Sequence, residues 1–306
     1  MKNAHVERAN SSLTTLQPQP QAAPSLRQSQ LALPLQRLRR NRGALTGLVI
    51  LTVIVLASAF APLLTPFDPS AITPQDRWLA PSPQHPFGTD NFGRDIFARV
   101  LHGGRVSLPM GLIAVVIAIA LGLMGGLLAG YYGGWVDGII MRCVDVMLAF
   151  PGLLLALVII ATLGPGLVTA MIAIGIASVP TFIRVVRAGV LSAREKEFVD
   201  AARALGVPDG HILVRHLLPN IVSPVIVLAT LGVASAIISG AALSFLGLGA
   251  KPPTPEWGAM LSESRSYLRV APWTTTFPGL AIVVTALAIN LIGDGLRDAL
   301  DPRMTI

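Results

Sequence analysis

Residues 146–183 read VMLAFPGLLLALVIIATLGPGLVTAMIAIGIASVPTFI and contain no Asp, Glu, Lys or Arg. A helix needs about 20 apolar residues to cross a membrane, so this run is long enough for two crossings. The sequence LGPGL at 163–167 supplies a turn near its middle, because glycine and proline interrupt regular structure. The stretch therefore predicts two consecutive transmembrane helices.

Further charge-free runs flank this pair on both sides, at 43–67, 106–136, 216–250 and 270–293. Hydrophobic residues make up 53% of the chain and charged residues 13%, and the mean hydropathy is +0.66, far from the soluble norm. We therefore expect an all-α membrane protein with six transmembrane helices. Their expected positions are about 43–64, 106–130, 142–163, 167–184, 220–245 and 273–292.

The distribution of positive charge predicts how these helices are oriented. An even number of crossings puts both termini on one side, and assigning that side to the cytoplasm places there 16 of the 23 Lys and Arg residues. This agrees with the known excess of positive charge on cytoplasmic loops. The net charge of +7 thus follows from topology, and we do not expect nucleic-acid binding.

The expected organisation has four parts. Residues 1–36, which include QPQPQAAPS, are predicted to be a disordered cytoplasmic tail. Residues 37–105 hold the first transmembrane helix and an outer loop, 106–293 a five-helix core, and 294–306 a cytoplasmic tail. The first apolar run is expected to be an anchor rather than a cleaved signal peptide, because it is too long and a 42-residue tail precedes it.

Motifs for covalent chemistry or ion transfer are not found in the sequence. Its lysines are Lys2, Lys196 and Lys251, none of them in a GxxxxGK phosphate loop. The histidines are too dispersed to predict a metal site, Cys143 is the only cysteine, and the predicted spans hold no ionisable relay. We predict a protein that is not an enzyme and binds no cofactor or metal of its own.

Small and polar residues inside the spans indicate helix packing. Two faces carry small residues four apart, which lets helices approach closely: Gly122, Gly126 and Gly130, and Gly232, Ala236 and Gly240.

Asn290 and Ser239 are the weak candidates for a substrate pathway, with ordinary packing as the alternative. Arg142 and Asp145, three apart, are expected to form an ion pair.

The loop at 187–219 is the largest one on the predicted cytoplasmic side, and it contains EFVDAARALGVPDGHILVRHLLPN at 197–220. Phe198, Ala201, Ala202 and Leu205 recur at helical spacing, and Gly206 is expected to end that helix. Asp209 is expected to cap a second short helix. That helix would turn one side inward: Ile212, Leu213, His216 and Leu217. Amphipathicity alone leaves open a membrane-surface helix or a plain connecting loop.

The spacing within this loop resembles the EAA loop of permease subunits in binding-protein-dependent ABC importers. The family pattern is EAA, three residues, Gly, nine residues, Ile, one residue, Leu-Pro. This chain matches it except for Asp200 in place of Glu and His216 in place of Ile. The segments at 85–108, 130–151 and 252–282 also resemble the second permease of dipeptide, oligopeptide, glutathione and nickel importers.

The resemblance implies a type I ABC importer permease fold in the bacterial cytoplasmic membrane. It implies a heterodimer with a homologous permease in the membrane lipid, two cytoplasmic subunits that use ATP and Mg²⁺, and an extracytoplasmic solute-binding protein. The loop would fit a cleft on an ATPase subunit through Asp200, Ala201, Ala202, Gly206, His216, Leu218 and Pro219. The implied cargo is a di- or oligopeptide or a glutathione-like peptide, with nickel or another small solute as the alternative. A stand-alone channel and a scaffold without transport are the competing classes.

The predicted outer segments, 65–105 and 246–272, are where a binding protein would dock. Charges in the first of them are expected to be solvated turn and cap residues with local ion pairs. They are Asp90, Arg94, Asp95, Arg99 and Arg105.

Overall fold

The computed structural model describes residues 41–300, and the predicted disorder of 1–36 lies outside this range. All the regular elements of the described chain are helices, and the only β-type pairing within it is an isolated bridge between Thr89 and Asp95. The helices before the loop at 187–219 are α2 (Arg42–Ala59), α3 (Ala61–Leu64), η1 (Pro74–Asp76), α4 (Ile96–Tyr132), α5 (Gly134–Leu148), α6 (Gly152–Leu163) and α7 (Leu167–Arg194). Those that follow are α8 (Glu197–Ala204), α9 (Asp209–His211), η2 (Ile212–Leu217), α10 (Leu218–Phe245), α11 (Trp257–Ser264), η3 (Arg265–Tyr267) and α12 (Trp273–Leu300).

Five helices are long and apolar enough to cross a membrane, and a sixth crossing is obtained if α5 and α6 count as one. The expected six spans are thus obtained when the bent pair is counted as one, with one correction to the third. Its two halves meet at a bend of 94°. Pro151 explains the break, because it lies between the halves, where its ring is incompatible with a helix interior.

The spans are longer than the charge-free runs suggested. α4 begins at Ile96 rather than at residue 106, and α12 runs to Leu300, so the predicted tail from residue 294 is still helical there. α4 has 37 residues and is therefore about 55 Å long, well beyond the hydrocarbon thickness of about 30 Å. Helices continue past the lipid because their backbone hydrogen bonds are satisfied within the helix.

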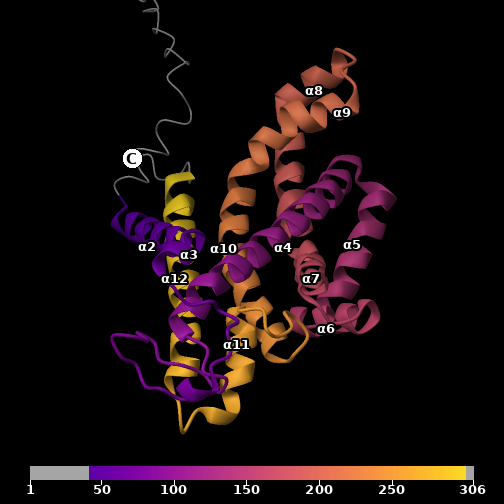
Figure 1. Ribbon diagram of the computed structural model, residues 1–306. Helices are drawn as coiled ribbons and strands as arrows, with labels where there is room; N and C mark the ends of the chain where they lie inside the picture. Colours follow the sequence, from indigo (N-terminus) through magenta and orange to yellow (C-terminus); the bar gives the residue numbers. More distant parts are fainter. Residues whose placement is uncertain (1–40, 301–306) are drawn as a thin grey trace, which may run out of the picture.

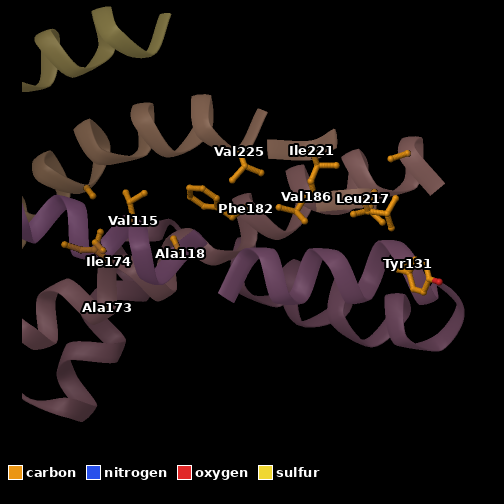
Figure 2. Close-up of a cluster of buried hydrophobic side chains, with 14 of the residues drawn as sticks. Val115, Ala118, Tyr131, Ala173, Ile174, Phe182, Val186, Leu217, Ile221 and Val225 are labelled. Atoms are coloured by element: carbon orange, nitrogen blue, oxygen red, sulfur yellow. The ribbon is translucent and has the colours of Figure 1, made fainter. Parts of the chain in front are cut away.

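The bundle core is centred on the crossing of α4 and α7. Gly122, Gly126 and Gly130 of α4 are buried, and a Cβ built on Gly126 would lie 2.5 Å from Cβ of Val186. This confirms the predicted small-residue face. Figure 2 shows buried side chains running continuously along this contact, from Ile174 to Tyr131 and Leu217.

The two ends of the bundle differ in structure. α8 and α9 project from one end, whereas α11 and the segment before α4 cover the other (Figure 1). The ends of the described chain lie together, since Asn41 Nδ2 donates to Asp298 Oδ2 at 3.3 Å. The helices α2 and α12 therefore begin and end, respectively, at the same end of the bundle.

Candidate functional site

The first helix of the 187–219 loop is α8, and it ends as predicted at a glycine. Gly206 has a φ of +72°, and the N–H of Val207 donates to the carbonyl of Ala202 at 3.1 Å. A residue in the left-handed region at this position is the common way for a helix to end, and glycine adopts it without strain. Nothing in the described chain lies within 4 Å of a Cβ built on Gly206.

The apolar residues that recur at helical spacing in α8 do not form its buried face. Val199 and Ala202 are buried, whereas Ala201 is exposed, Phe198 is 38% exposed and Leu205 is 84% exposed. A helix of eight residues makes barely two turns, so its spacing does not fix which side packs inward. The loop therefore presents Phe198 and Leu205 to its surroundings.

The second half of the loop is α9 followed by the π-helical turn η2, which continues directly into α10. Ile212 and Leu217 are fully buried, as the predicted inward side requires, and Leu213 and His216 are half-buried. Asp209 does not cap this segment: Pro208 occupies the N-cap position and makes no side-chain cap bond. The Asp209 carboxylate instead accepts a hydrogen bond from the Tyr131 hydroxyl at 2.6 Å.

We call residues 197–217 the helical knob. Its buried side chains belong to the same hydrophobic cluster as Val186, Val190 and Ile221 of the neighbouring spans. The cluster extends without interruption from the bundle into the knob, as Figure 2 shows for Leu217 and Ile221. The knob is thus packed onto α7 and α10 as a part of the bundle.

The residues of the EAA-like pattern divide between the outer and inner surfaces of the knob. Asp200, Ala201 and Gly206 are exposed, and so is Pro219 in the first turn of α10. Ala202 is buried and Leu218 is half-buried. His216 lies beside His211, with ring centroids 5.8 Å apart. The pattern thus contributes both an exposed surface and part of the support beneath it.

Two ion pairs join α5 to α7 near the knob. Both terminal oxygens of Asp137 accept from Arg187, at 2.5 Å each, and Asp145 Oδ1 accepts from Arg184 at 2.7 Å. The predicted pair between Arg142 and Asp145 is not formed, because Asp145 faces Arg184 of α7 instead. A charged side chain on one helix can find a partner on another helix that sequence spacing does not reveal.

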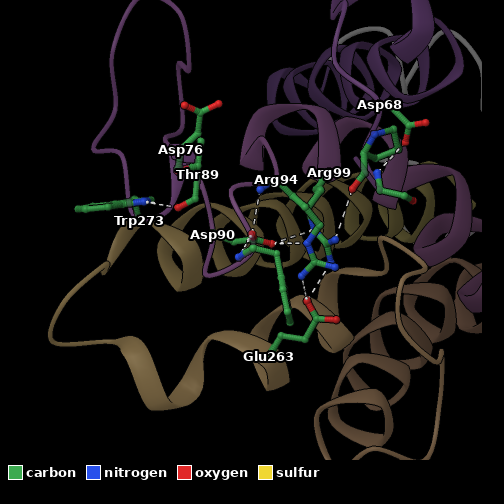
Figure 3. Close-up of polar contacts among 11 residues, drawn as sticks. Asp68, Asp76, Thr89, Asp90, Arg94, Arg99, Glu263 and Trp273 are labelled. Carbon is green, nitrogen blue, oxygen red and sulfur yellow. Dashed lines mark hydrogen bonds and ion pairs between the residues drawn. The ribbon is translucent and has the colours of Figure 1, made fainter. Parts of the chain in front are cut away.

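At the opposite end of the molecule four charged residues form what we call the outer ion network: Asp90, Arg94, Arg99 and Glu263 (Figure 3). Arg94 donates to Asp90 at 2.6 Å and to Glu263 at 2.5 Å, and Arg99 donates to Glu263 at 3.1 Å. Asp90, Arg94 and Arg99 are at most 6% exposed, so the expectation of solvated charges is wrong for them. The cause is Glu263 of α11, which supplies a distant carboxylate to both arginines.

Further buried polar residues hold the same end together. Asp95 is also buried. It caps α4 by accepting from the N–H of Ala98 at 2.6 Å, and its other oxygen lies 2.8 Å from His85 Nδ1.

Glu256 is fully buried and caps α11, and it accepts from the Ser107 hydroxyl at 3.1 Å. The sequence interpretation missed Glu256, although an acidic residue directly before a helix signals a cap. Of the charges expected to be solvated, only Arg105 is exposed.

The two candidates for a substrate pathway are not brought together. Ser239 is half-buried and lines a small cavity between α6, α7 and α10, together with Ser178 and Ala156. Asn290 is exposed on α12 and does not line that cavity. Within residues 41–300 no group of three potential metal ligands is found.

Comparison with protein families gives two matches that together cover most of the chain. Residues 122–306 match the binding-protein-dependent transport system inner membrane component, and 29–82 match the N-terminal TM domain of oligopeptide transport permease C. The first match alone covers more than half of the sequence.

Similar curated proteins span almost the same length. A dipeptide transport system permease protein of Alkalihalophilus pseudofirmus is 50% identical over 269 residues, which is 88% of both chains. A glutathione transport system permease protein of Shigella flexneri is 49% identical over 270 residues, covering 88% of this chain and 89% of that protein.

Solved structures show the same fold at low identity. An inward-facing methionine ABC transporter chain superposes with a TM-score of 0.54 and 18% identity, covering 66% of this chain and 97% of that one. A chain of an amino acid ABC transporter gives a TM-score of 0.51 at 16% identity, covering 66% of this chain and 94% of that one. The helical bundle, the family matches and the two relatives lead to one conclusion: this chain belongs to the binding-protein-dependent transport system inner membrane components, and is a multi-pass inner-membrane permease with the type I ABC importer fold.

Proposed function

We propose that this chain is one of two homologous permease subunits of an ATP-driven importer of short peptides, such as dipeptides or a glutathione-like peptide. The observation that carries the cargo class is the identity of about one half, over nearly the full length, to permeases named for dipeptide and for glutathione. This favours peptides over nickel, the alternative raised by the sequence.

In this proposal the energy comes from separate subunits. The sequence has no GxxxxGK phosphate loop, and the charged residues that the structure buries lie at the α11 end of the bundle, where they are held in ion pairs or, for Glu256, by a cap. Two cytoplasmic ATPase subunits bind ATP and Mg²⁺, and this chain itself is not an enzyme. An extracytoplasmic solute-binding protein delivers the peptide at the α11 end.

The helical knob is the proposed contact with an ATPase subunit. Its exposed surface carries Asp200, Ala201 and Gly206 of the EAA-like pattern, flanked by the apolar side chains of Phe198 and Leu205. Apolar groups with a few charges around them are typical of protein interfaces. Ala202 beneath α8, and His216 and Leu218 beside α10, support that surface, and Pro219 extends it into the first turn of α10. This role puts the knob and both termini in the cytoplasm.

The proposed pathway for the peptide runs along the bundle at its contact with the homologous permease. Ser239 in the cavity beside α6 and Asn290 on α12 are proposed to line successive parts of it, because both lie in spans and offer hydrogen-bonding groups. A peptide carries many hydrogen-bonding groups, each of which loses water on entry and so needs a polar partner.

Uptake in a reconstituted system tests this proposal. Proteoliposomes contain both permeases, the ATPase subunits and internal ATP, and the binding protein is added outside with radiolabelled dipeptide, glutathione or nickel. We expect ATP-dependent uptake of a peptide and none of nickel. Nickel uptake without peptide uptake would overturn the cargo class. Solute flux through this chain alone, without nucleotide, would instead establish a channel.

The role of the knob is tested in the same vesicles by Asp200→Asn, with Asp294→Asn as the matched control. Both carboxylates are exposed, but Asp294 lies on α12 away from the knob. We expect lower uptake and weaker binding of the ATPase subunit for Asp200→Asn alone. Equal behaviour of the two variants would argue against the proposed contact.

A further inference from the structure

Tyr131 lies at the place where α4 and both halves of the helical knob meet. It is the last residue but one of α4 and only 6% exposed. Its hydroxyl donates to Asp209 Oδ1 of α9 at 2.6 Å, and the Arg203 guanidinium of α8 lies 5.0 Å from its ring centre. One side chain of α4 thus contacts both α8 and α9.

The two contacts use different parts of the tyrosine. The bond to Asp209 is made to a carboxylate, and hydrogen bonds to charged groups are stronger than those between neutral groups. The contact with Arg203 uses the face of the ring, which attracts a cation through its quadrupole. A phenylalanine would therefore keep the contact of the ring face with Arg203 and lose the hydrogen bond to Asp209.

The position of Tyr131 near the end of α4 determines which parts of the molecule these contacts hold together. α4 and α7 pack through glycines along their length, so α4 is held firmly within the bundle. Gly133, two residues after Tyr131, has a φ of +65° and turns the chain into α5. In the described chain, no other hydrogen bond to the Asp209 side chain is found. This bond is thus the polar tie between α4 and the second half of the knob.

We propose that Tyr131 is a positioning residue for energy coupling: its hydrogen bond to Asp209 makes the helical knob and α4 move together. A displacement of the knob by the ATPase subunits is then passed to α4 as well as to α7 and α10, onto which the knob is packed. Without the bond, the knob moves while α4 lags behind. This inference rests on the proposed function, because it assigns the means of transmission within the same transporter.

The adjacent tyrosine provides a matched control. Tyr132 is 52% exposed, and within residues 41–300 its hydroxyl makes no hydrogen bond to a side chain or backbone group. Tyr132→Phe and Tyr131→Phe remove the same oxygen atom from neighbouring positions on one helix. Only the second removes the bond to Asp209.

The test measures the number of peptide molecules imported per ATP hydrolysed, using the complete transporter with its binding protein. For Tyr131→Phe we expect this ratio to fall about tenfold. This is the change in an equilibrium constant that corresponds to the loss of one hydrogen bond to a charged group. The ATPase rate and the amount of assembled complex should stay near those of the wild type. Tyr132→Phe should leave the ratio unchanged.

Asp209→Asn and the double variant with Tyr131→Phe complete the test. Because both residues act through one bond, the double variant should lower the ratio no further than Tyr131→Phe alone. An unchanged ratio in Tyr131→Phe would overturn the inference. So would a fall in uptake and ATPase activity in equal proportion with loss of assembled complex, which is what a merely structural role predicts. A wild-type transporter that imports no peptide would contradict the proposed function instead, so the two failures are distinguishable.

Discussion

Arg94 and Glu263 are 169 positions apart in the sequence, yet their side chains meet at 2.5 Å at the α11 end of the bundle. Arg94 belongs to the segment that leads into α4, and Glu263 belongs to α11. Since Arg99 binds the same carboxylate oxygen, one acidic residue holds two buried cations. The two outer segments of the chain are thereby joined into one unit.

Removal of the Glu263 charge should destabilise this end of the molecule. Glu263→Gln leaves Arg94 and Arg99 with Asp90 as their remaining carboxylate, and breaking a buried ion pair from one side costs about 3 kcal/mol. We expect a lower melting temperature of the purified permease. Glu195→Gln, which changes an exposed glutamate, serves as the control and should leave the melting temperature unchanged. Equal melting temperatures for the two variants would contradict the role assigned to Glu263.

The same substitution should have opposite effects at two glycines. Gly126→Ala places a Cβ 2.5 Å from Cβ of Val186, and such overpacking costs about 1–3 kcal/mol. Gly138→Ala in α5 meets nothing within 4 Å and should stabilise the helix by about 0.5–1 kcal/mol. Thermal unfolding of the two variants in detergent measures both effects. A stable Gly126→Ala variant would show that α4 and α7 can separate freely.

Gly206 is sensitive to backbone conformation rather than to side-chain size. An alanine at its φ of +72° costs about 1–2 kcal/mol, although nothing obstructs the added carbon. Asparagine tolerates this conformation better, so Gly206→Asn should retain more of the ATPase subunit than Gly206→Ala in a pull-down. Gly210→Ala has equal space and no positive φ, and it should resemble the wild type. If Gly206→Ala bound the ATPase as well as Gly206→Asn did, the knob would not depend on this turn.

The two ion pairs between α5 and α7 should differ in strength. Arg187 binds both oxygens of Asp137, and the two side chains are 30% and 20% exposed, whereas those of Arg184 and Asp145 are 51% and 57% exposed. We expect Arg187→Gln to lower the free energy of unfolding by about 1 kcal/mol and Arg184→Gln to change it little. Chemical denaturation of both variants tests the order. Stronger destabilisation by Arg184→Gln would reverse our assignment of the main contact between these helices.

The spans could be predicted because lipid requires apolar side chains along a whole helix. A long run of apolar residues in the sequence shows this directly. Gly206 was predictable for a similar reason, since a left-handed residue at a helix end is a local requirement. The glycine face of α4 followed from spacing alone.

The features that the sequence did not reveal depend on distant partners. Arg99 was taken for a solvated charge outside the second span, but Asp90 and Glu263 allow it to lie buried within α4. Asp209 was predicted to be a cap because the sequence does not show that Tyr131 lies next to it. In both cases the charge is satisfied by residues far along the chain.

The bend between α5 and α6 leaves neither helix long enough to cross the membrane by itself. α5 has 15 residues and so is about 22 Å long, less than the hydrocarbon thickness of about 30 Å, and α6 turns away from it by 94°. Such hydrophobic mismatch is relieved when the bilayer thins locally, or when another protein replaces the lipid beside the short helix. The assembled transporter should therefore respond to the acyl-chain length of its lipids, and its α5 side sets the thickness of membrane that suits it.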